Sequence, residues 1–294
     1  MAVSLAQFRA LVAVNDHGGF AAAADELGIT QSAVSHAVAA LEAELGAVLV
    51  VRKPVFALTA TGVEVLPHAR SALASADALV SAATEAGDRA GTVRLAAPST
   101  VCFGLLPGLL SGWKSAFPSI TVRVFEGDDP ELVAWLEDGT VDAAILVNPE
   151  HPHPDAVTVD RDDYRAVVRN DHPLADAERI EVADLLDDSV LVSGGGCGPE
   201  VTAMFRRHDP RFRPAQRVYD NAALLNFVAA GLGITVFPSI GSGMLAPGTR
   251  MLPLNPPIER ALVFSGPSHR PWNPLVQALR NTLSPAAATG QSET

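Results

Sequence analysis

The sequence has few cysteines and an excess of acidic residues. Its 294 residues include only two cysteines, Cys102 and Cys197. So few cysteines argue against a disulfide-stapled secreted domain and fit a reducing cytosol, so we expect a cytoplasmic protein. The formal net charge of −12 counts against a nucleic-acid binder, because contacts to phosphates provide much of the affinity for DNA.

Leader, membrane and catalytic motifs are also missing. Residues 1–15 lack the basic start and the cleavage site of a signal peptide, and no apolar run is long enough to cross a bilayer. The histidines lack metal-ligand spacing, and neither a nucleophile elbow nor a catalytic triad is present. We therefore expect no membrane partner, no metal, no cofactor and no enzyme activity.

The distribution of charge is more favourable to DNA binding than its sum. Residues 1–90 carry nine acidic residues against five basic ones, but residues 27–41 contain no acid, and Arg52 and Lys53 stand together shortly afterwards. A dimer would present this face twice. We expect a DNA binder with modest non-specific affinity.

Residues 19–62 have the pattern of a winged helix-turn-helix. An alanine-rich short helix stops at Gly28, Thr30 stands at a helix N-cap position, and a longer helix follows with one apolar and one polar side. Residues 48–52 and 56–58 predict a small hairpin, the wing. Short polar side chains at the start of a second helix suit the DNA major groove, although a merely solvated helix face is the other interpretation. The expected DNA-contacting residues are Thr30, Gln31, Ser32, Ser35 and His36 on the helix, with Arg52 and Lys53 on the wing.

A long helix is expected to begin near Thr61. Its apolar residues follow one another at alternating spacings of three and four: Leu66, Ala69, Leu73, Ala76, Val80 and Ala83. Such a heptad seam is typical of helix pairing, so we expect dimerisation through Leu66, Leu73 and Val80. The alternative is an amphipathic helix packed on its own domain. Pro67 should bend the helix near its start.

From Thr92 onwards, predicted strands and helices alternate. Strands are expected at 93–97, 120–125 and 141–147, with helices at 105–117 and 130–137, and a second series begins with a strand at 164–169. Alternation predicts a parallel α/β architecture, and its doubling predicts two lobes with a ligand crevice between them.

These patterns predict the following domains. Residues 1–60 form a winged helix-turn-helix DNA-binding domain, and 61–90 a linker (dimerisation) helix and hinge. Residues 91–284 form the effector-binding domain, with lobe 1 at about 91–160 and 265–284 and lobe 2 at about 161–264. Residues 285–294 are expected to be a disordered tail.

Loops that follow strands are expected to converge at the crevice. The expected effector-binding residues are Ser99, Thr100, Gly127, Asp128, Asn148, Gly195, Gly196 and Cys197. Residues 194–198 (Gly-Gly-Gly-Cys-Gly) form a glycine loop. It is followed by Pro199, where a dinucleotide fingerprint has its last glycine, but free backbone donors at the following helix could hold an anion. A plain flexible turn is the alternative. Few basic side chains lie near these loops, so we expect a small anionic or polar metabolite, best a mono- or dicarboxylate, rather than a nucleotide.

Both cysteines fall near this predicted crevice. A redox-sensing pair is one interpretation of Cys102 and Cys197. Small packing residues are the other, and the more common one for cysteines of this kind.

The chain resembles the LysR-type transcriptional regulators over essentially its whole length. In the first part the resemblance rests on Gly19-Phe20, Ala23-Ala24, residues 30–35 (Thr-Gln-Ser-Ala-Val-Ser), Leu41-Glu42, Leu45-Gly46 and Leu58-Thr59. In the second it rests on residues 136–145 (Leu-Glu-Asp-Gly-Thr-Val-Asp-Ala-Ala-Ile), His172-Pro173-Leu174 and residues 228–238 (Val-Ala-Ala-Gly-Leu-Gly-Ile-Thr-Val-Phe-Pro).

The resemblance implies a winged helix-turn-helix, a dimerising linker helix and a two-lobed effector domain resembling periplasmic binding proteins. It also implies a homo-oligomer, usually a tetramer, that controls transcription on binding a small metabolite, with double-stranded DNA and RNA polymerase as partners. The chain departs from the family pattern at three places. Gly19 stands where serine is common, Val50-Val51 replaces a usual phenylalanine, and His36 stands where arginine is frequent.

The leading interpretation is a DNA-binding regulator controlled by a small metabolite. The alternative is a cytosolic small-molecule binding protein whose acidic first domain has lost DNA binding. An intact turn motif opposes that alternative, and an enzyme comes third for want of catalytic groups.

Overall fold

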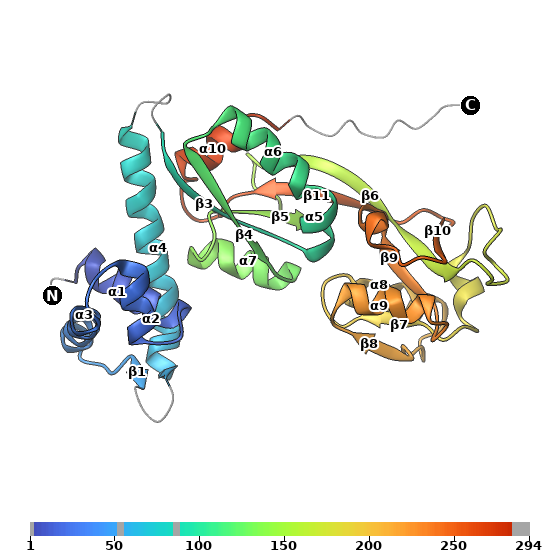
Figure 1. Cartoon of the computed structure of the whole chain (residues 1–294), viewed down its shortest axis with the longest axis horizontal. Helices are drawn as coiled ribbons and strands as arrows, with labels where there is room; N and C mark the ends of the chain where they lie inside the picture. The colour runs from blue at the N-terminus through green and yellow to red at the C-terminus, as the bar shows by residue number, and fades with distance from the viewer. Residues whose placement is uncertain (1–2, 52–55, 85–88, 284–294) are drawn as a thin grey trace. The chain divides into compact units, whose positions relative to one another are not determined.

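The structure is a computed structural model that describes residues 3–51, 56–84 and 89–283 (Figure 1). The described residues divide into two compact units. Unit 1 comprises those within Met1–Ala90, Ala134–Asp142 and Pro267–Gln277, and unit 2 those within Gly91–Val133, Ala143–Gly266 and Ala278–Thr294. No helix in the described part of the chain is long and apolar enough to span a membrane.

Three short helices begin unit 1: α1 (Leu5–Asp16), α2 (Phe20–Leu27) and α3 (Gln31–Leu45). Ser4 and Gln7 form a capping box at the start of α1. Gly28 and Gly46 end α2 and α3 in the left-handed conformation, with φ of 64° and 66°, which glycine adopts at no steric cost. The local sequence therefore sets where each helix of the predicted motif stops.

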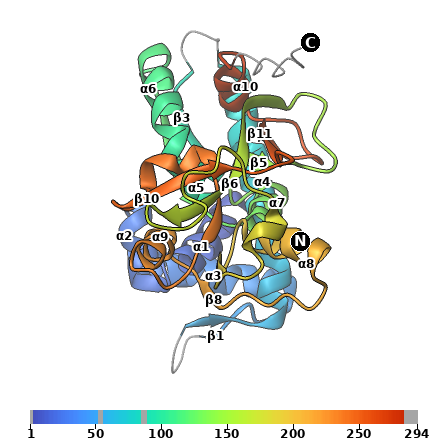
Figure 2. The same ribbon diagram turned by 90° about the vertical axis from the view of Figure 1, so that its right-hand side faces the viewer.

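The core of these helices is made of small and aliphatic side chains. Ala23, Val34, Val38 and Leu41 are fully buried, and the small side chain of Ala23 lets α2 approach its neighbours closely. In Figures 1 and 2 the three helices gather around the first half of α4 (Ala60–Ala83). The apolar side of α3 is thus used for packing, which leaves its polar side outward.

The wing is a two-stranded antiparallel hairpin, β1 (Val50–Val51) and β2 (Ala57–Leu58). The carboxylate of Glu42, near the end of α3, accepts the backbone N–H groups of Leu49 at 2.8 Å and Val50 at 3.2 Å. This acid therefore ties the wing to α3. The expected wing contacts Arg52 and Lys53 lie outside the described residues.

Helix α4 passes through Pro67 without a break, and its two halves differ in burial. In the first half Ala69 is buried, and Arg70 forms an ion pair with Asp16 of α1. In the second half Leu79 and Val80 are 71% and 65% exposed. Each interpretation of the heptad seam thus describes one half of the helix. The first half packs on its own domain, and the second half presents apolar side chains outward.

Unit 2 is built on a seven-stranded mixed sheet in the order β10-β6-β11-β5-β3-β4, with β9 pairing β6. The strands are β3 (Gly91–Ala97), β4 (Ile120–Glu126), β5 (Ala143–Val147), β6 (Val157–Arg169), β9 (Thr235–Pro238), β10 (Thr249–Pro253) and β11 (Glu259–Ser265). Strand β3 is parallel to β4 and β5, but β11 is antiparallel to β5 and β6. The expected parallel arrangement holds for β3, β4 and β5. It does not hold for β6 and β11, because the chain crosses between lobes along β6 and returns along β11.

Strand β6 is longer than its apolar pattern predicts. The strand begins at Val157, seven residues before the predicted start at Tyr164. Residues 157–163 pair with β11 in lobe 1, and residues 164–169 pair with β9 and β10 in lobe 2, so the strand runs from one lobe to the other (Figure 1). The first half of β6 was not predicted because it contains the run Asp160-Arg161-Asp162-Asp163, which is too polar to be recognised as a buried strand.

Helices complete both lobes. Helices α5 (Ser99–Gly104) and α6 (Leu106–Ala116) follow β3, α7 (Asp129–Asp138) follows β4, and α10 (Pro274–Arg280) comes last. Trp113 of α6 packs edge-on against Phe264 of β11, with ring centroids 6.1 Å apart. Lobe 2 adds the parallel pair β7 (Leu191–Ser193) and β8 (Gln216–Val218), with α8 (Gly198–His208) and α9 (Asn221–Ala229). Two 3-10 turns are also present in unit 2, η2 (Val182–Leu185) and η3 (Ser239–Met244).

Candidate functional site

The first candidate site is the start of α3, the expected recognition helix. The Thr30 hydroxyl accepts the Ala33 N–H at 3.2 Å, so Thr30 caps the helix. Gln31, Ser32 and His36 are exposed in the first two turns, and Ser35 is half-buried among them. Three different polar groups thus project from one helix end, the geometry that reading base edges in a major groove requires.

The second candidate site is a cleft in unit 2 with a volume of about 270 Å³. Its walls come from the loops after β3 and β4 in lobe 1, and from the loops after β7 and β8 in lobe 2. Of the eight residues expected at the crevice, these line it: Ser99, Thr100, Gly127, Asp128, Gly195, Gly196 and Cys197. The rule that ligands bind beyond the carboxyl ends of strands therefore located the cleft.

The eighth expected residue, Asn148, does not line the cleft, so its expected position is corrected. Its backbone has a left-handed φ of 44°, and its side-chain oxygen accepts the backbone N–H of Ala261 at 2.7 Å. Asparagine is among the few non-glycine residues that adopt this conformation readily. These contacts hold the turn after β5 against β11, and the residue of this region that lines the cleft is Val147, at the end of β5.

The glycine loop before α8 is already occupied by a carboxylate of the protein. The backbone N–H of Gly196 donates to Asp128 Oδ1 at 2.7 Å. A Cβ atom at Gly195 would lie 2.3 Å from Asp128 Oδ2, so glycine permits this approach. At least one backbone donor of this loop is therefore used by Asp128 and is not free for an external anion.

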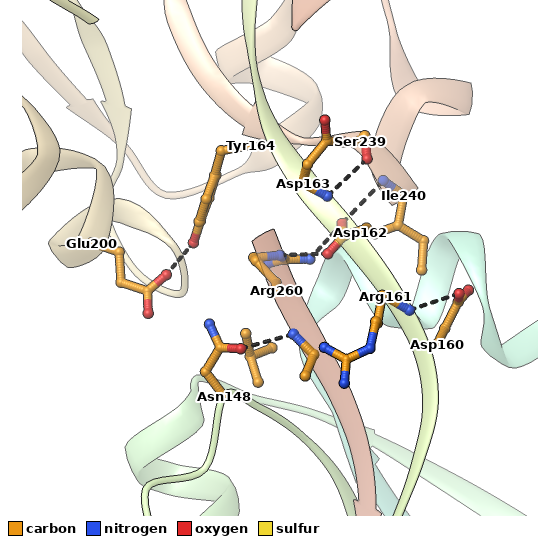
Figure 3. A network of polar contacts seen from close by, with 12 residues as sticks. Asn148, Asp160, Arg161, Asp162, Asp163, Tyr164, Glu200, Ser239, Ile240 and Arg260 are labelled. Atoms are coloured by element: carbon orange, nitrogen blue, oxygen red, sulfur yellow. Dashed lines mark hydrogen bonds and ion pairs between the residues drawn. The ribbon is translucent and has the colours of Figure 1, made fainter. Parts of the chain in front are cut away.

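A buried ion pair joins β6 to β11 (Figure 3), and its arginine, Arg260, lines the cleft. The Nε and Nη2 groups of Arg260 donate to the two carboxylate oxygens of Asp162 at 2.8 and 2.9 Å, and these side chains are 3% and 5% exposed. The guanidinium lies 5.2 Å from the centroid of the Tyr164 ring, and the Tyr164 hydroxyl donates to Glu200 of α8. Strands β6 and β11 thus carry charged groups where they cross between lobes.

This ion pair was missed by sequence reasoning. Arg260 and Asp162 are 98 positions apart in the chain, and each lies within a short polar stretch that looks like a strand end. The one available signal was Arg260 itself, a cation next to the apolar run Ala261–Phe264, since buried arginines need a carboxylate partner.

Negative charge dominates the cleft. Its lining includes one cation, Arg260, and five acids: Glu126, Asp128, Asp129, Glu131 and Asp220. Burial raises the pKa of the Asp129 carboxyl above its usual value, and Glu200 and Asp128 raise it further, while the Val147 N–H and Arg260 oppose the shift. A lining of this charge disfavours a mono- or dicarboxylate without a positive group.

The two cysteines have different surroundings. Cys197 lines the cleft, and burial raises the pKa of its thiol to about 12. Cys102 is not part of the lining, and its thiol donates to the Ala97 carbonyl at 3.5 Å. Burial raises the pKa of Cys102 to about 11. Since the thiolate is the reactive form, neither cysteine in this conformation is activated at neutral pH.

Known protein families match both parts of the chain. Residues 5–63 match the family described as "Bacterial regulatory helix-turn-helix protein, lysR family". Residues 86–288 match the family described as "LysR substrate binding domain". The HTH-type transcriptional regulator YvbU of Bacillus subtilis, itself uncharacterized, is 31% identical over 90% of this chain and 92% of its own length. A probable hydrogen peroxide-inducible genes activator of Mycobacterium avium is 36% identical over 80% of this chain and 78% of its own length.

Solved structures agree with the observed architecture. A cysteine-to-aspartate variant of full-length OxyR from Pseudomonas aeruginosa aligns with a TM-score of 0.76 at 23% identity, over 96% of this chain and 95% of that one. Full-length CbnR in complex with its target DNA aligns with a TM-score of 0.65 at 25% identity, over 95% and 97% of the two chains. The expected fold, a winged helix-turn-helix followed by a two-lobed α/β effector domain, is confirmed, and this chain belongs to the LysR family of transcriptional regulators.

Proposed function

We propose that this regulator binds its operator through the start of α3 and through the wing, and that a small polar ligand held in the cleft of unit 2 controls its activity. The proposal that a ligand in the cleft controls activity rests on one observation: loops of both lobes line the cleft. A ligand that contacts both walls changes the balance between open and closed lobes, and only such a difference in affinity can shift that balance.

For DNA recognition, we assign the groove contacts to Gln31, Ser32, Ser35 and His36, and the phosphate or minor-groove contacts to Arg52 and Lys53. Thr30 acts by capping the helix. Gln31 can pair with adenine through two hydrogen bonds. The operator-bound form of the similar CbnR supports this use of the first domain over the alternative of a degenerate acidic one.

For assembly, we propose that Leu66, Leu73 and Val80 lie between two copies of α4 in a dimer, with a tetramer as the larger assembly. Leu66 is only partly buried by the core of its own domain, so it can contribute to both contacts. We retain domain boundaries at 60, 90 and 284, RNA polymerase as the partner in transcription, and the cytoplasm, where the DNA is, as the location. Closure of the lobes would change how the dimers sit on DNA.

The experiment is a gel shift and footprint of the full-length protein on the DNA that flanks its own gene. We expect a protected site with two related half-sites, because a twofold protein reads a twofold operator. Affinity should fall steeply with salt. A protein that binds this DNA no better than unrelated DNA at the same salt would support the alternative, a small-molecule binding protein.

A second candidate is peroxide sensing by Cys197. The Mycobacterium avium relative supports it, as does the position of Cys197 at the N-cap of α8 in the cleft. In the reaction the thiol would lose its proton, its sulfur would attack one peroxide oxygen, and the O–O bond would break to give sulfenic acid and hydroxide; the hydroxide would take up that proton and leave as water. The raised pKa of this thiol opposes the idea.

Mass spectrometry after brief peroxide treatment separates the two candidates. Peroxide sensing requires a sulfenic acid on Cys197 at micromolar peroxide and a changed footprint that Cys197→Ser abolishes. If Cys197 stays reduced until the protein is unfolded, the thiol is a packing residue of the cleft wall.

A further inference from the structure

We propose that the ligand of the cleft is a small zwitterion of amino-acid type, whose ammonium group contacts the carboxylates of Asp128 and Asp129 and whose carboxylate contacts Arg260. This inference rests on the proposed function, because it assigns the chemical class of the ligand that the cleft binds. It also replaces the anionic metabolite expected from the sequence.

The first argument is an imbalance of charge around Asp129, which lines the cleft. Asp129 is influenced electrostatically by Asp128, Glu200 and Arg260, and Arg260 is paired with Asp162. Carboxylates therefore outnumber the one guanidinium among the charged groups that act on Asp129. Partly buried charges of one sign repel each other strongly, because the local dielectric constant is well below that of water. An ammonium group would relieve this repulsion and could donate three hydrogen bonds.

The second argument is an incompletely used cation. The Asp162 carboxylate accepts hydrogen bonds from the Nε and Nη2 groups of Arg260. The Nη1 group has no hydrogen-bond partner among the residues that the structure describes. The side chain is only 3% exposed, yet it lines the cleft. A buried guanidinium with an available nitrogen attracts a carboxylate, and a hydrogen bond between two charged groups is stronger than a neutral one. Arg260 therefore supplies the place for the second charge of the ligand.

The third argument concerns size and shape. A volume of about 270 Å³ is at the small end of ligand pockets, which typically span about 300–1,000 Å³. Tyr219 lines the cleft, is 82% exposed and lies against Gly194, where a Cβ atom would come within 2.6 Å of the ring. An exposed aromatic ring offers a surface for the apolar part of a ligand or for its cation.

A metal ion is a weaker explanation of the negative charge. Within the described ranges, no group of three or more histidine, cysteine, aspartate or glutamate side chains converges as metal ligands would. Asp128 is also held by Gly196, and the acids of the cleft are spread along both walls. An organic cation, whose donors can reach separate acceptors, fits this spread better than a compact ion does.

The experiment is a thermal-shift screen of the purified full-length protein. The probes are the twenty common amino acids and, for each, the carboxylate that lacks the amine and the amine that lacks the carboxylate. We expect at least one amino acid to raise Tm by about 5 °C at a concentration about 100-fold above its Kd. The two matched analogues should each produce less than a fifth of that shift.

Matched variants connect the shift to the cleft. Asp129→Asn should abolish the shift caused by the amino acid. Glu150→Gln removes the same charge from an exposed side chain outside the cleft lining and should leave the shift unchanged. The assignment is overturned if a carboxylate or an amine alone stabilises as well as its parent amino acid, if no amino acid stabilises the protein, or if Asp129→Asn responds like the wild type.

Operator binding of the same preparation separates this inference from the proposed function. A protein that protects its operator but fails the screen retains the regulator assignment and loses the zwitterion. A protein that passes the screen but binds no operator is a small-molecule binding protein, and the proposed function fails instead.

Discussion

The carboxylate of Asp128, in the loop after β4, accepts the backbone N–H of Gly196, in the loop before α8, at 2.7 Å. The two residues are 68 positions apart in the chain and stand on opposite walls of the cleft. A ligand that enters the cleft meets this contact, so its strength bears on how readily the walls separate.

Asp128→Ala should remove this contact and destabilise the protein. A hydrogen bond from a backbone donor to a carboxylate contributes about 1.5–3 kcal/mol, so we expect the free energy of unfolding to fall by about 1–2 kcal/mol at this half-buried site. Urea unfolding monitored by fluorescence measures it. Asp128→Asn keeps an acceptor oxygen and should recover most of the loss. Equal stability of the Ala variant and the wild type would show that the contact contributes nothing.

Asp162→Ala should be far more damaging, because it leaves the Arg260 guanidinium buried without its partner. Breaking a buried ion pair from one side costs about 3–5 kcal/mol, and the N–H of Ile240 loses its acceptor as well. Thermal unfolding and urea unfolding both report the change. The matched control is Asp171→Ala, which removes the partner of Arg169 from a pair 41% and 67% exposed. It should leave stability near that of the wild type, and similar losses in both variants would refute the burial argument.

Asp129→Asn should stabilise the ligand-free protein at neutral pH. Because the pKa of Asp129 is raised in the folded state, the folded protein binds its proton more tightly than the unfolded chain does. The ionised carboxylate therefore opposes folding, fully once the pH is above the folded pKa and not at all below the unfolded value of about 3.9.

Urea unfolding of both proteins between pH 3 and pH 8 checks the sign. The variant should be more stable at pH 7, and the difference should shrink as the pH falls towards 4. An advantage of the wild type at pH 7 would show that the Asp129 carboxylate is compensated by its neighbours.

Ser35→Glu should abolish operator binding without unfolding the first domain. The change places a carboxylate at the start of α3, where it would face phosphate oxygens. Gel shifts at fixed salt measure affinity, and circular dichroism measures the fold. Ala43→Glu adds the same charge at an exposed position two turns later on α3 and should weaken binding far less. If the two variants bind alike, the assigned face of α3 is wrong.

Val80→Glu should weaken dimerisation. Val80 is 65% exposed within its own chain, so the change leaves the core of that chain intact, but between two helices it would bury an unpaired charge. Sedimentation at micromolar concentration should show dissociation. Ser75→Glu, exposed on α4 outside the expected seam, is the control. A wild-type protein that sediments as a monomer would contradict the seam itself.

Local signals determined much of this protein. Helix stops at Gly28 and Gly46, the Thr30 cap and the apolar side of α3 predict the helix-turn-helix, because caps and amphipathic spacing act within a few residues. Strand ends likewise predicted seven of the residues that line the cleft. The resemblance to LysR-type regulators, which the family comparisons confirm, rests on the same short motifs.

Only the tertiary structure decided the direction of β11, the length of β6, the turn made by Asn148 and the charge of the cleft. Each depends on partners distant in the chain: Asp162 with Arg260, Asn148 with Ala261, Asp128 with Gly196. A sequence shows that Asp128 is acidic and that the Gly196 loop has donors, but not that one satisfies the other. The charge that a ligand meets in the cleft is therefore decided by the tertiary structure, because the energy of a charge depends on what surrounds it in space.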